Sequence, residues 1–490
     1  MNQPKLNHVL YDAINAWENA VKRVDACELV RAAISVEGRM LNVGGHAFDL
    51  DQLERIRIVG AGKATGSMLR GAELALGRGV LFDKRVSGWI NIPERDESAI
   101  SKTPGAVAPN AESKVHRVGF GGNPGVWRFH ARPAGENLPT ENCYAGTLLI
   151  EDIVRRTGPD QLCLCLFSGG GSALLTHPAK GVELDDIRKL TTWMSGAKAS
   201  IRQLNIVRQQ ISQVKGGRLA SKFRGHHLVS LIISDVLSDQ VDLVASGPTA
   251  KSDTGPEDAL QVLRELDPKL RRVPKSILRH LERANSKSGS KPGSKPDLIP
   301  DNVSNHLIGN IRVAVEACKA ELEAKGFTVF TEIQSDEFET AEEAATRLAN
   351  WLIDKATTDQ PVALVSGGEP VVQLGRNPGK GGRNQHLVLS ALIELINSEH
   401  HRLDSIEFAL LSGGTDGEDG TTSVAGAYLC NELLQKAVQQ GLNPSSYLKR
   451  NDSFTFFEKE LDAPFLNAPP FLETNVCDLR VVAISPGKQR

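Results

Sequence analysis

The chain has 490 residues, of which 40% are apolar and 24% are charged. These fractions are typical of globular proteins, and at roughly 100–200 residues per domain the length predicts two or three domains. The 57 Lys and Arg residues almost balance the 59 Asp and Glu residues, which argues against nucleic acid as a partner. No apolar run approaches the ~18 residues of a membrane span, so we expect no membrane partner.

Seven cysteines are scattered along the chain, and the only close pair is Cys163 and Cys165. Residues two apart in an extended strand have Cα atoms about 6–7 Å apart, which makes a disulfide between them awkward. We interpret the cysteines as buried, reduced thiols. Reduced thiols, together with an N-terminus that lacks the pattern of a signal peptide, predict a cytoplasmic protein.

Short apolar strands alternate with amphipathic helices along most of the sequence. The helix expected at 339–354 begins with a capping box formed by Thr340 and Glu343, and the helix expected at 312–325 ends at Gly326. Strands rich in Val, Ile and Leu that are separated by helices predict an α/β fold with mainly parallel sheets. The clearest strand candidates are 57–59, 162–167, 228–234, 328–332, 361–365, 406–411 and 479–485.

Two segments break this alternation. Residues 284–302 are rich in Ser, Lys, Gly and Pro without periodicity, and we expect a flexible loop there. The irregular stretch at 93–139 is typical either of an active-site loop or of a surface excursion. A strand-rich half ends near Pro248, so we predict one domain at 1–248 and a second at 249–490.

Three predicted strands lead into the same tripeptide, Ser-Gly-Gly. In open parallel sheets ligands bind beyond the carboxyl ends of the strands, where glycines let backbone N–H groups approach an anion. One such tripeptide is typical of an ordinary turn, but three in one chain favour a binding role. The candidate substrate- or phosphate-binding residues of these turns are Ser168, Gly169, Gly170, Gly171, Ser172, Ser366, Gly367, Gly368 and Gly414.

A glycine turn at 60–66 follows the first predicted strand and opens a helix. Gly60 and Gly62 resemble a dinucleotide-binding turn, but the third glycine comes one position late for G-x-G-x-x-G. Lys63 is the informative residue, because a cation at the positive end of a helix dipole is unfavourable unless an anion shares the site. We therefore predict a bound anion beside Lys63.

A second glycine turn, at 379–385, repeats this arrangement before an apolar helix. Its G-x-x-x-G-K spacing is one residue short of a P-loop and lacks the following Ser or Thr, so we reject a P-loop fold. Arg383 can grip a carboxylate or phosphate with two parallel hydrogen bonds, which a lysine cannot do. We predict Arg383 as a catalytic cation, with Lys380, Gly381, Gly382 and Asn384 as binding residues.

A third cationic group, formed by Asn205, Arg208 and Lys215, is either a substrate-binding set or part of a basic surface helix. Asp235 and Asp416 each follow a predicted strand, where a carboxylate could hold magnesium or act as a general base in phosphoryl transfer. Asp235 is our candidate base, and both aspartates are candidate Mg²⁺ ligands, although aspartates in such positions also cap turns. The chain has no H-E-x-x-H, C-x-x-C or G-x-S-x-G motif, which disfavours zinc and hydrolase chemistry.

These motifs, in this order, resemble those of the glycerate 2-kinases, the class II glycerate kinases with a C-terminal MOFRL domain. The resemblance extends from about Val24 to Val482. It rests on G-A-G-K-A at 60–64, S-G-G-G-S-A-L-L at 168–175, N-I-V-R at 205–208, K-G-G-R-L-A at 215–220, A-S-G-P-T at 245–249, G-K-G-G-R-N-Q at 379–385, G-T-D-G at 414–417 and T-N-V at 474–476.

The resemblance implies two Rossmann-like α/β domains with mainly parallel sheets, an active site in the interdomain cleft, and a MOFRL region at about 360–485. It implies transfer of the ATP γ-phosphoryl group to the 2-hydroxyl of D-glycerate, with Mg²⁺. Lys63 and Arg383 match the essential cations of the family, and Thr415 of the G-T-D-G motif is a further candidate binding residue. We expect a monomer or homodimer whose partners are glycerate and ATP.

The chain departs from the family pattern at 130–136, at His386, at 421–424 and at 469–473. These departures leave open the hydroxy-acid acceptor, the metal ligands and the identity of the base. Two other functions also stay open. One is an NAD(P)H-dependent hydroxypyruvate reductase, in which Asp83 would hold the ribose, and the other is a catalytically inactive protein that binds sugar acids.

Overall fold

The chain divides into two compact units, which we describe separately. Residues 26–308 form the first unit, and residues 1–25 together with 309–490 form the second unit. The structure, a computed structural model, describes residues 7–94, 115–118, 125–133, 137–288, 299–335, 338–398, 400–467 and 474–487. Among these residues, no helix combines the length and the apolar character needed to cross a membrane.

The first unit contains a seven-stranded sheet, whose strands in chain order are β4 (Arg55–Ala61), β5 (Ser87–Pro93), β6 (Val115–Val118), β7 (Gly125–Arg132), β8 (Gln161–Phe167), β9 (His227–Ile233) and β10 (Val303–Gly309). Their spatial order is β10-β9-β8-β4-β5-β7-β6. β4 pairs in parallel with β5 and β8, as do β5 with β7 and β8 with β9, whereas β6 is antiparallel to β7. This is the order of a doubly wound sheet, in which ligands bind where the strand order reverses, here beyond the carboxyl ends of β4 and β8.

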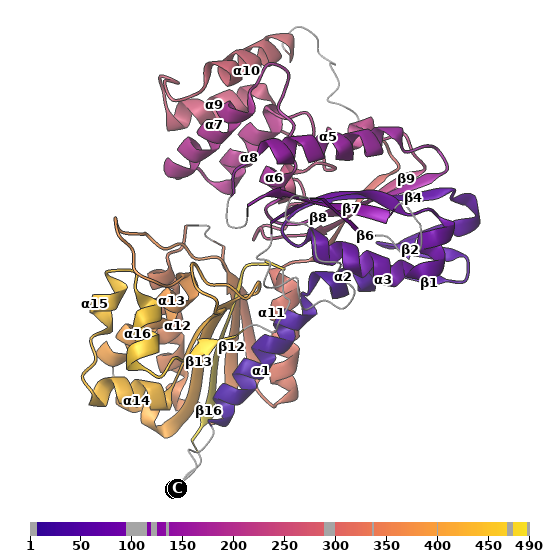
Figure 1. Cartoon of the computed structure of the whole chain (residues 1–490). Helices are drawn as coiled ribbons and strands as arrows, with labels where there is room; N and C mark the ends of the chain where they lie inside the picture. The colour runs from indigo at the N-terminus through magenta and orange to yellow at the C-terminus, as the bar shows by residue number, and fades with distance from the viewer. Residues whose placement is uncertain are drawn as a thin grey trace. The chain divides into compact units, whose positions relative to one another are not determined.

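Helices cover both faces of this sheet. The helices of the first unit are α2 (Ala26–Ala33), α3 (Thr65–Asp83), α5 (Glu141–Arg156), α6 (Gly171–Leu174), α7 (Leu184–Gly196), α8 (Ile201–Gln210), α9 (Pro256–Leu266) and α10 (Lys275–Ser288). Figure 1 shows α5 on one face of the sheet and α2 with α3 on the other. A separate antiparallel sheet follows α2 and consists of β1 (Ile34–Glu37), β2 (Met40–Val43) and β3 (His46–Asp49).

The predicted domain boundary near Pro248 is wrong. Helices α7, α8, α9 and α10 bury their apolar faces in one cluster that includes Leu190, Val207, Leu263 and Ile277. A boundary at 248 would separate α9 and α10 from the helices that cover them. Helix α10 also includes residues 284–288, which we expected in a flexible loop. The rest of that loop up to residue 298, and the departing positions 134–136 and 469–473, lie outside the described residues.

The second unit contains a six-stranded sheet, whose strands are β11 (Thr328–Ile333), β12 (Val362–Gly368), β13 (Ile406–Gly414), β14 (Gly426–Cys430), β15 (Phe465–Leu466) and β16 (Asp478–Pro486). β11 and β12 are parallel, but β16 lies between β12 and β13 and is antiparallel to both. β14 is antiparallel to β13 and to β15. The α/β class is confirmed, whereas the prediction of a mainly parallel sheet holds in the first unit and is wrong for the second.

The helices of the second unit are α1 (His8–Arg23), α11 (Ile311–Ala324), α12 (Ala341–Asp354), α13 (Arg383–Asn397), α14 (Asn431–Gln439), α15 (Pro444–Leu448) and α16 (Ser453–Glu460). Figure 1 shows α1 and α11 on one face of the sheet and α12 with α13 on the other. The apolar face of α1 includes Trp17, which is fully buried, and Asn7 at its start donates to the Phe408 carbonyl at 3.3 Å. The first 25 residues therefore belong to the second unit and not, as predicted, to an N-terminal domain.

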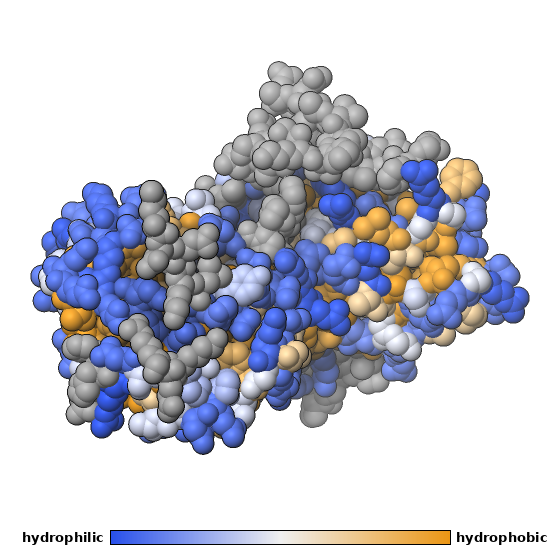
Figure 2. All heavy atoms as spheres, turned by 90° about the horizontal axis from the view of Figure 1, so that it is seen from below, coloured by the Kyte–Doolittle hydropathy of each residue, from blue (hydrophilic) through white to orange (hydrophobic). Residues whose placement is uncertain are grey.

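All seven cysteines are buried and free of disulfides, as predicted. Apolar side chains also reach the surface: Leu74 and Phe82 of α3 are more than half exposed. Figure 2 shows such hydrophobic residues among the hydrophilic ones on one face of the molecule.

Candidate active site

Two glycine turns lie against each other at the carboxyl ends of β4 and β8. The Lys63 N–H donates to the Gly169 carbonyl at 2.8 Å, and the Ala64 N–H donates to Ser168 Oγ at 3.1 Å. Glycine is required at positions 60 and 62, because a Cβ there would collide with β8 or with the turn that follows it. The predicted glycine turn and the first Ser-Gly-Gly turn therefore form one structure.

Charged side chains surround the two glycines of this structure. A Cβ at Gly169 would collide with Oδ2 of Asp235, so the carboxylate lies directly over this glycine. A Cβ at Gly170 would lie 3.0 Å from Cγ of Lys63 and 3.4 Å from Nη2 of Arg132. Two cations and one carboxylate thus gather at the edge of the sheet where the strand order reverses.

The same turn offers backbone donors to a ligand. Within the described part of the chain, the N–H groups of Gly169 and Gly170 donate to no acceptor. Gly170 has a φ of 77°, a left-handed conformation that glycine adopts readily. Nearby, α3 has no side-chain cap and no acidic residue in its first turn, and the exposed Lys63 comes just before it. An anion here would meet two donors, a cation and the positive end of the α3 dipole.

Gly171 and Ser172 continue the turn into α6 and rest on the predicted A-S-G-P-T motif. A Cβ at Gly171 would lie 2.6 Å from the Ala245 Cβ, and Ser172 Oγ lies 2.9 Å from Ser246 Oγ. Ala245 and Ser246 have φ values of 52° and 63°, which are costly for residues other than glycine. This strained segment supports the turn at the candidate site.

The other two Ser-Gly-Gly tripeptides do not form turns. Residues 366–368 end β12 and residues 412–414 end β13, and both tripeptides pair with residues 478–480 of β16. Their glycines make room for helices: a Cβ at Gly367 would collide with Ile311, and one at Gly413 would lie 2.7 Å from Trp17. Ser366, Gly367, Gly368 and Gly414 therefore do not form turns as expected, because they continue the strands of an antiparallel ladder, and their role in binding stays a prediction.

Arg383 is the first residue of α13, and two carboxylates hold it. Its Nε and Nη2 donate to Asp478 at 2.6 and 3.0 Å, and its Nη1 donates to Glu369 at 2.7 Å. Burial lowers the pKa of Arg383, but Asp478 and Glu369 outweigh burial and raise the pKa above its ordinary value. The bidentate edge that we predicted for a substrate is therefore occupied by Asp478. Of the five guanidinium N–H donors, about two remain for a ligand.

Asp419 supplies the anion at the N-terminus of α13. Its Oδ1 accepts from the N–H and side chain of Asn384 at 3.0 and 3.2 Å, and its Oδ2 accepts from those of Gln385 at 2.8 and 2.9 Å. Burial raises the pKa of Asp419 to about 6, although these hydrogen bonds lower it. Gly382 is needed because a Cβ there would collide with Asp419. The helix dipole thus meets a carboxylate of the protein itself at α13, whereas the first turn of α3 contains no acidic residue.

The remaining predicted residues of the second unit have structural contacts. Lys380 is exposed, and its Nζ lies 3.7 Å from the centre of the Phe454 ring. Thr415 donates to the Cys477 carbonyl at 2.8 Å and accepts from a backbone N–H, and Asp416 accepts from the Glu418 N–H at 3.3 Å. A Cβ at Gly381 would collide with Oγ of Ser453. Asp416 therefore has the contacts of a turn-capping aspartate.

The structure brings Arg208 and Lys215 together but not Asn205. Arg208 and Lys215 line one pocket of the first unit, whereas Asn205, which is buried, lines another. Burial and the nearby Arg208 lower the pKa of Lys215 to about 7. Arg218, whose motif we also singled out, donates to the Gln209 carbonyl at 2.6 Å and has a structural role.

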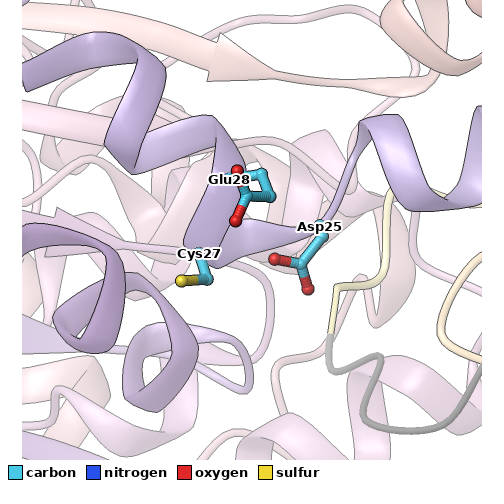
Figure 3. Close-up of side chains that lie close together, drawn as sticks. All are labelled: Asp25, Cys27 and Glu28. Carbon is cyan, nitrogen blue, oxygen red and sulfur yellow. The ribbon is translucent and has the colours of Figure 1, made fainter. Parts of the chain in front are cut away.

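One group of three potential metal ligands occurs in the described residues, and it is not the predicted one. Ligand atoms of Asp25, Cys27 and Glu28 lie within 4.8 Å of one another (Figure 3). Glu28 is already paired with Arg31 at 2.8 Å, and Cys27 is buried. Neither Asp235 nor Asp416 belongs to such a group within the described chain.

Asp83 is badly placed for the ribose of a nicotinamide cofactor. It ends α3 and precedes β5, so it lies at the edge of the sheet opposite to the Gly60 turn. A ribose partner would have to follow β5 at the carboxyl edge.

Three charged residues of these sites were not among the site residues that we predicted from the sequence. Arg132 ends a strand inside a stretch that we treated as irregular, and it is 1% exposed. Asp478 comes directly before the last predicted strand, which is the signal that could have identified it. Asp419 was visible in the G-T-D-G region, but its contacts with α13 depend on the tertiary fold.

Comparisons with known proteins agree with these motifs. A model of a domain of unknown function, DUF4147, matches residues 12–282, and the MOFRL family model matches residues 362–478. The chain is 30% identical to glycerate kinase of Rattus norvegicus, covering 96% of this chain and 92% of that protein. It is 36% identical to D-glycerate 2-kinase of Thermotoga maritima, covering 72% of this chain and 79% of the relative.

A solved structure shows the same fold. The crystal structure of glycerate kinase from Thermotoga maritima superposes with a TM-score of 0.73 at 30% identity, covering 97% of this chain and 99% of that one. The matches span both units and include the glycine turns at β4 and β8. The chain, which matches both the DUF4147 and the MOFRL models, therefore belongs to the glycerate kinase family.

Proposed function

We propose that this protein transfers the γ-phosphoryl group of ATP to the 2-hydroxyl of D-glycerate, giving 2-phospho-D-glycerate and ADP. The names of its relatives, glycerate kinase and D-glycerate 2-kinase, support the acceptor. The observation that carries the proposal is the group of Lys63, Arg132, Asp235 and the two free N–H donors at Gly169 and Gly170.

This group suits phosphoryl transfer, in which catalysis is mostly positioning and charge stabilisation. Lys63 is exposed and stabilises the charge on the transferring phosphoryl group, together with the donors of Gly169 and Gly170. Asp235 accepts the proton of the attacking hydroxyl as the general base. The two free N–H donors of Arg383, and the exposed Lys380, are proposed as further contacts to substrate.

In the alternative role that the sequence leaves open, Asp235 would hold Mg²⁺ instead of acting as the base. Magnesium in such sites is bound by one or two carboxylates, with water and substrate phosphates as the other ligands, and a single aspartate past a strand end fits this pattern. When bound, the ion neutralises charge on the triphosphate. Asp416 is proposed as a second ligand, and one of its oxygens also accepts the Glu418 N–H at 3.3 Å.

Asn205, Arg208 and Lys215 are proposed as substrate-binding residues, and a cytoplasmic location is proposed from the reduced thiols. The interdomain active site and the monomer or homodimer stay predictions.

The purified protein, mixed with D-glycerate, ATP and Mg²⁺, should release ADP in proportion to glycerate consumed, as measured by a coupled assay. Two parallel reactions separate the alternatives. Oxidation of NADH with hydroxypyruvate would indicate the reductase, and saturable binding of glycerate without either reaction would indicate an inactive binding protein. Either result in place of ADP formation would contradict the proposal.

A further inference from the structure

A pocket in the first unit holds two cations. It lies between α6, α7 and α8 and is lined by Arg208 of α8 and by Lys215 from the segment after α8. Hydroxyl groups of Ser172, Thr176 and Ser212 also line it.

No carboxylate of the described chain lines this pocket. Lys215 Nζ donates to the carbonyls of Ser172 and Leu175, both at 2.8 Å, which leaves its charge without an anion. Arg208 forms no hydrogen bond or ion pair within the described residues. Arg218, by contrast, donates to two backbone carbonyls. Lys215 is buried and Arg208 is partly buried, and two neighbouring positive charges of this kind cost free energy unless an anion joins them.

The pocket adjoins the proposed phosphoryl-transfer turn through Ser172. Ser172 is two residues from Gly170, beside which Lys63 lies. Two residues of chain span at most about 7 Å, so the pocket and the turn are within reach of a small substrate.

We propose that Arg208 and Lys215 bind the carboxylate of a small hydroxy acid in this pocket. The inference rests on the proposed function, in which that acid is glycerate, and it assigns the acid group of the acceptor to one place. Arg208 provides a fork of donors that matches a carboxylate, and the third N–H of Lys215 is free to contribute a point charge.

We expect Lys215 to take up a proton when the carboxylate of the hydroxy acid binds. Burial and Arg208 lower the pKa of Lys215 to about 7, and a bound carboxylate would raise it again. The other titratable groups that face this region are Cys143 of α5 and His177, which is 2.7 Å from Glu151. Glu151 also pairs with Lys222 at 3.1 Å, so the charge of Glu151 is already compensated by His177 and Lys222 and does not neutralise Lys215. Affinity should therefore fall as the pH rises above 7, by at most about tenfold per pH unit.

Calorimetric titration of the nucleotide-free, full-length protein with D-glycerate tests this assignment. We expect proton uptake, seen as a buffer-dependent heat at pH 8, and weaker binding at pH 8.5 than at pH 6.5. Arg208→Gln should weaken binding at least about tenfold, in the range expected for loss of a charged hydrogen-bond partner. Arg202→Gln, an exposed arginine on the same helix, is the matched control and should bind normally.

Three outcomes would overturn the assignment. These are normal glycerate binding by Arg208→Gln, affinity that is equal at both pH values, and Arg208-dependent binding of inorganic phosphate as tight as that of glycerate. ADP formation by the wild-type protein separates this inference from the proposed function. Glycerate binding that depends on Arg208 in a protein that makes no ADP would support the pocket and contradict the kinase. Turnover by Arg208→Gln with an unchanged KM for glycerate would do the reverse.

Discussion

Lys63 and Arg383 are the two cations that the resemblance marks as essential, and their surroundings differ. Lys63 is exposed beside a turn with free backbone donors, and it forms no ion pair within the described residues. Arg383 is bound by Asp478 and Glu369. We therefore expect Lys63 to bind a ligand, and Arg383 to stabilise the fold through its ion pairs.

Replacing Lys63 should remove activity without loss of stability. Lys63→Ala should lower kcat at least about 100-fold, the effect of removing one electrostatic contact to a transition state. The thermal unfolding midpoint should stay near that of the wild type, because the side chain is exposed. Lys84→Ala, at the other end of α3, is the control and should leave both quantities unchanged. A Lys63→Ala protein with normal kcat would exclude Lys63 from the reaction.

Replacing Arg383 should destabilise the protein. Arg383→Ala would leave Asp478 buried without its ion pair, which costs about 3–5 kcal/mol of unfolding free energy. Adding Asp478→Asn should restore part of this loss, because it removes the buried charge. Arg376→Ala, at an exposed position in the preceding loop, is the control. Urea unfolding of the four proteins measures the effect, and equal stability of Arg383→Ala and wild type would contradict the structural role.

At the level of elements, the Ser-Gly-Gly tripeptides show that one sequence pattern can have two causes. After β8 the tripeptide forms a turn with free donors, whereas in β12 and β13 it continues the strand. There the missing side chains admit α11 and α1. Both causes need glycine, so the pattern alone could not distinguish them.

This interpretation predicts a specific effect at Gly413. Gly413→Ala would place a Cβ 2.7 Å from Trp17 of α1, and the strain of overpacking a core costs about 1–3 kcal/mol. Gly79→Ala is the control, because nothing lies within 4 Å of its Cβ position and alanine favours the helix. Equal unfolding free energies for the two variants would contradict the packing of α1 on the sheet of the second unit.

At the level of the whole molecule, local patterns predicted much of the first unit. The strands at 162–167 and 228–234, the turn at Lys63, and Asp235 could be identified because each depends on neighbouring residues. The capping box at Thr340 is also present in the structure.

Features that depend on distant pairing could not be predicted. β16 enters the sheet between β12 and β13 in the reverse direction, and this brings Asp478 to Arg383 across 95 residues. Helix α1 belongs to the second unit because its apolar face packs on a sheet whose strands lie more than 300 residues further along the chain. The sequence around α1 does not indicate which sheet it packs on. The domain boundary was missed for the same reason, since α9 and α10 are covered by helices that precede Pro248.

The most direct test of the central claim is phosphorus NMR of the product made from D-glycerate, ATP and Mg²⁺. The account predicts resonances of ADP and of 2-phospho-D-glycerate, both abolished by Lys63→Ala and retained by Lys84→Ala. A product phosphorylated at the 3-hydroxyl, or an ATP spectrum that does not change, would contradict it.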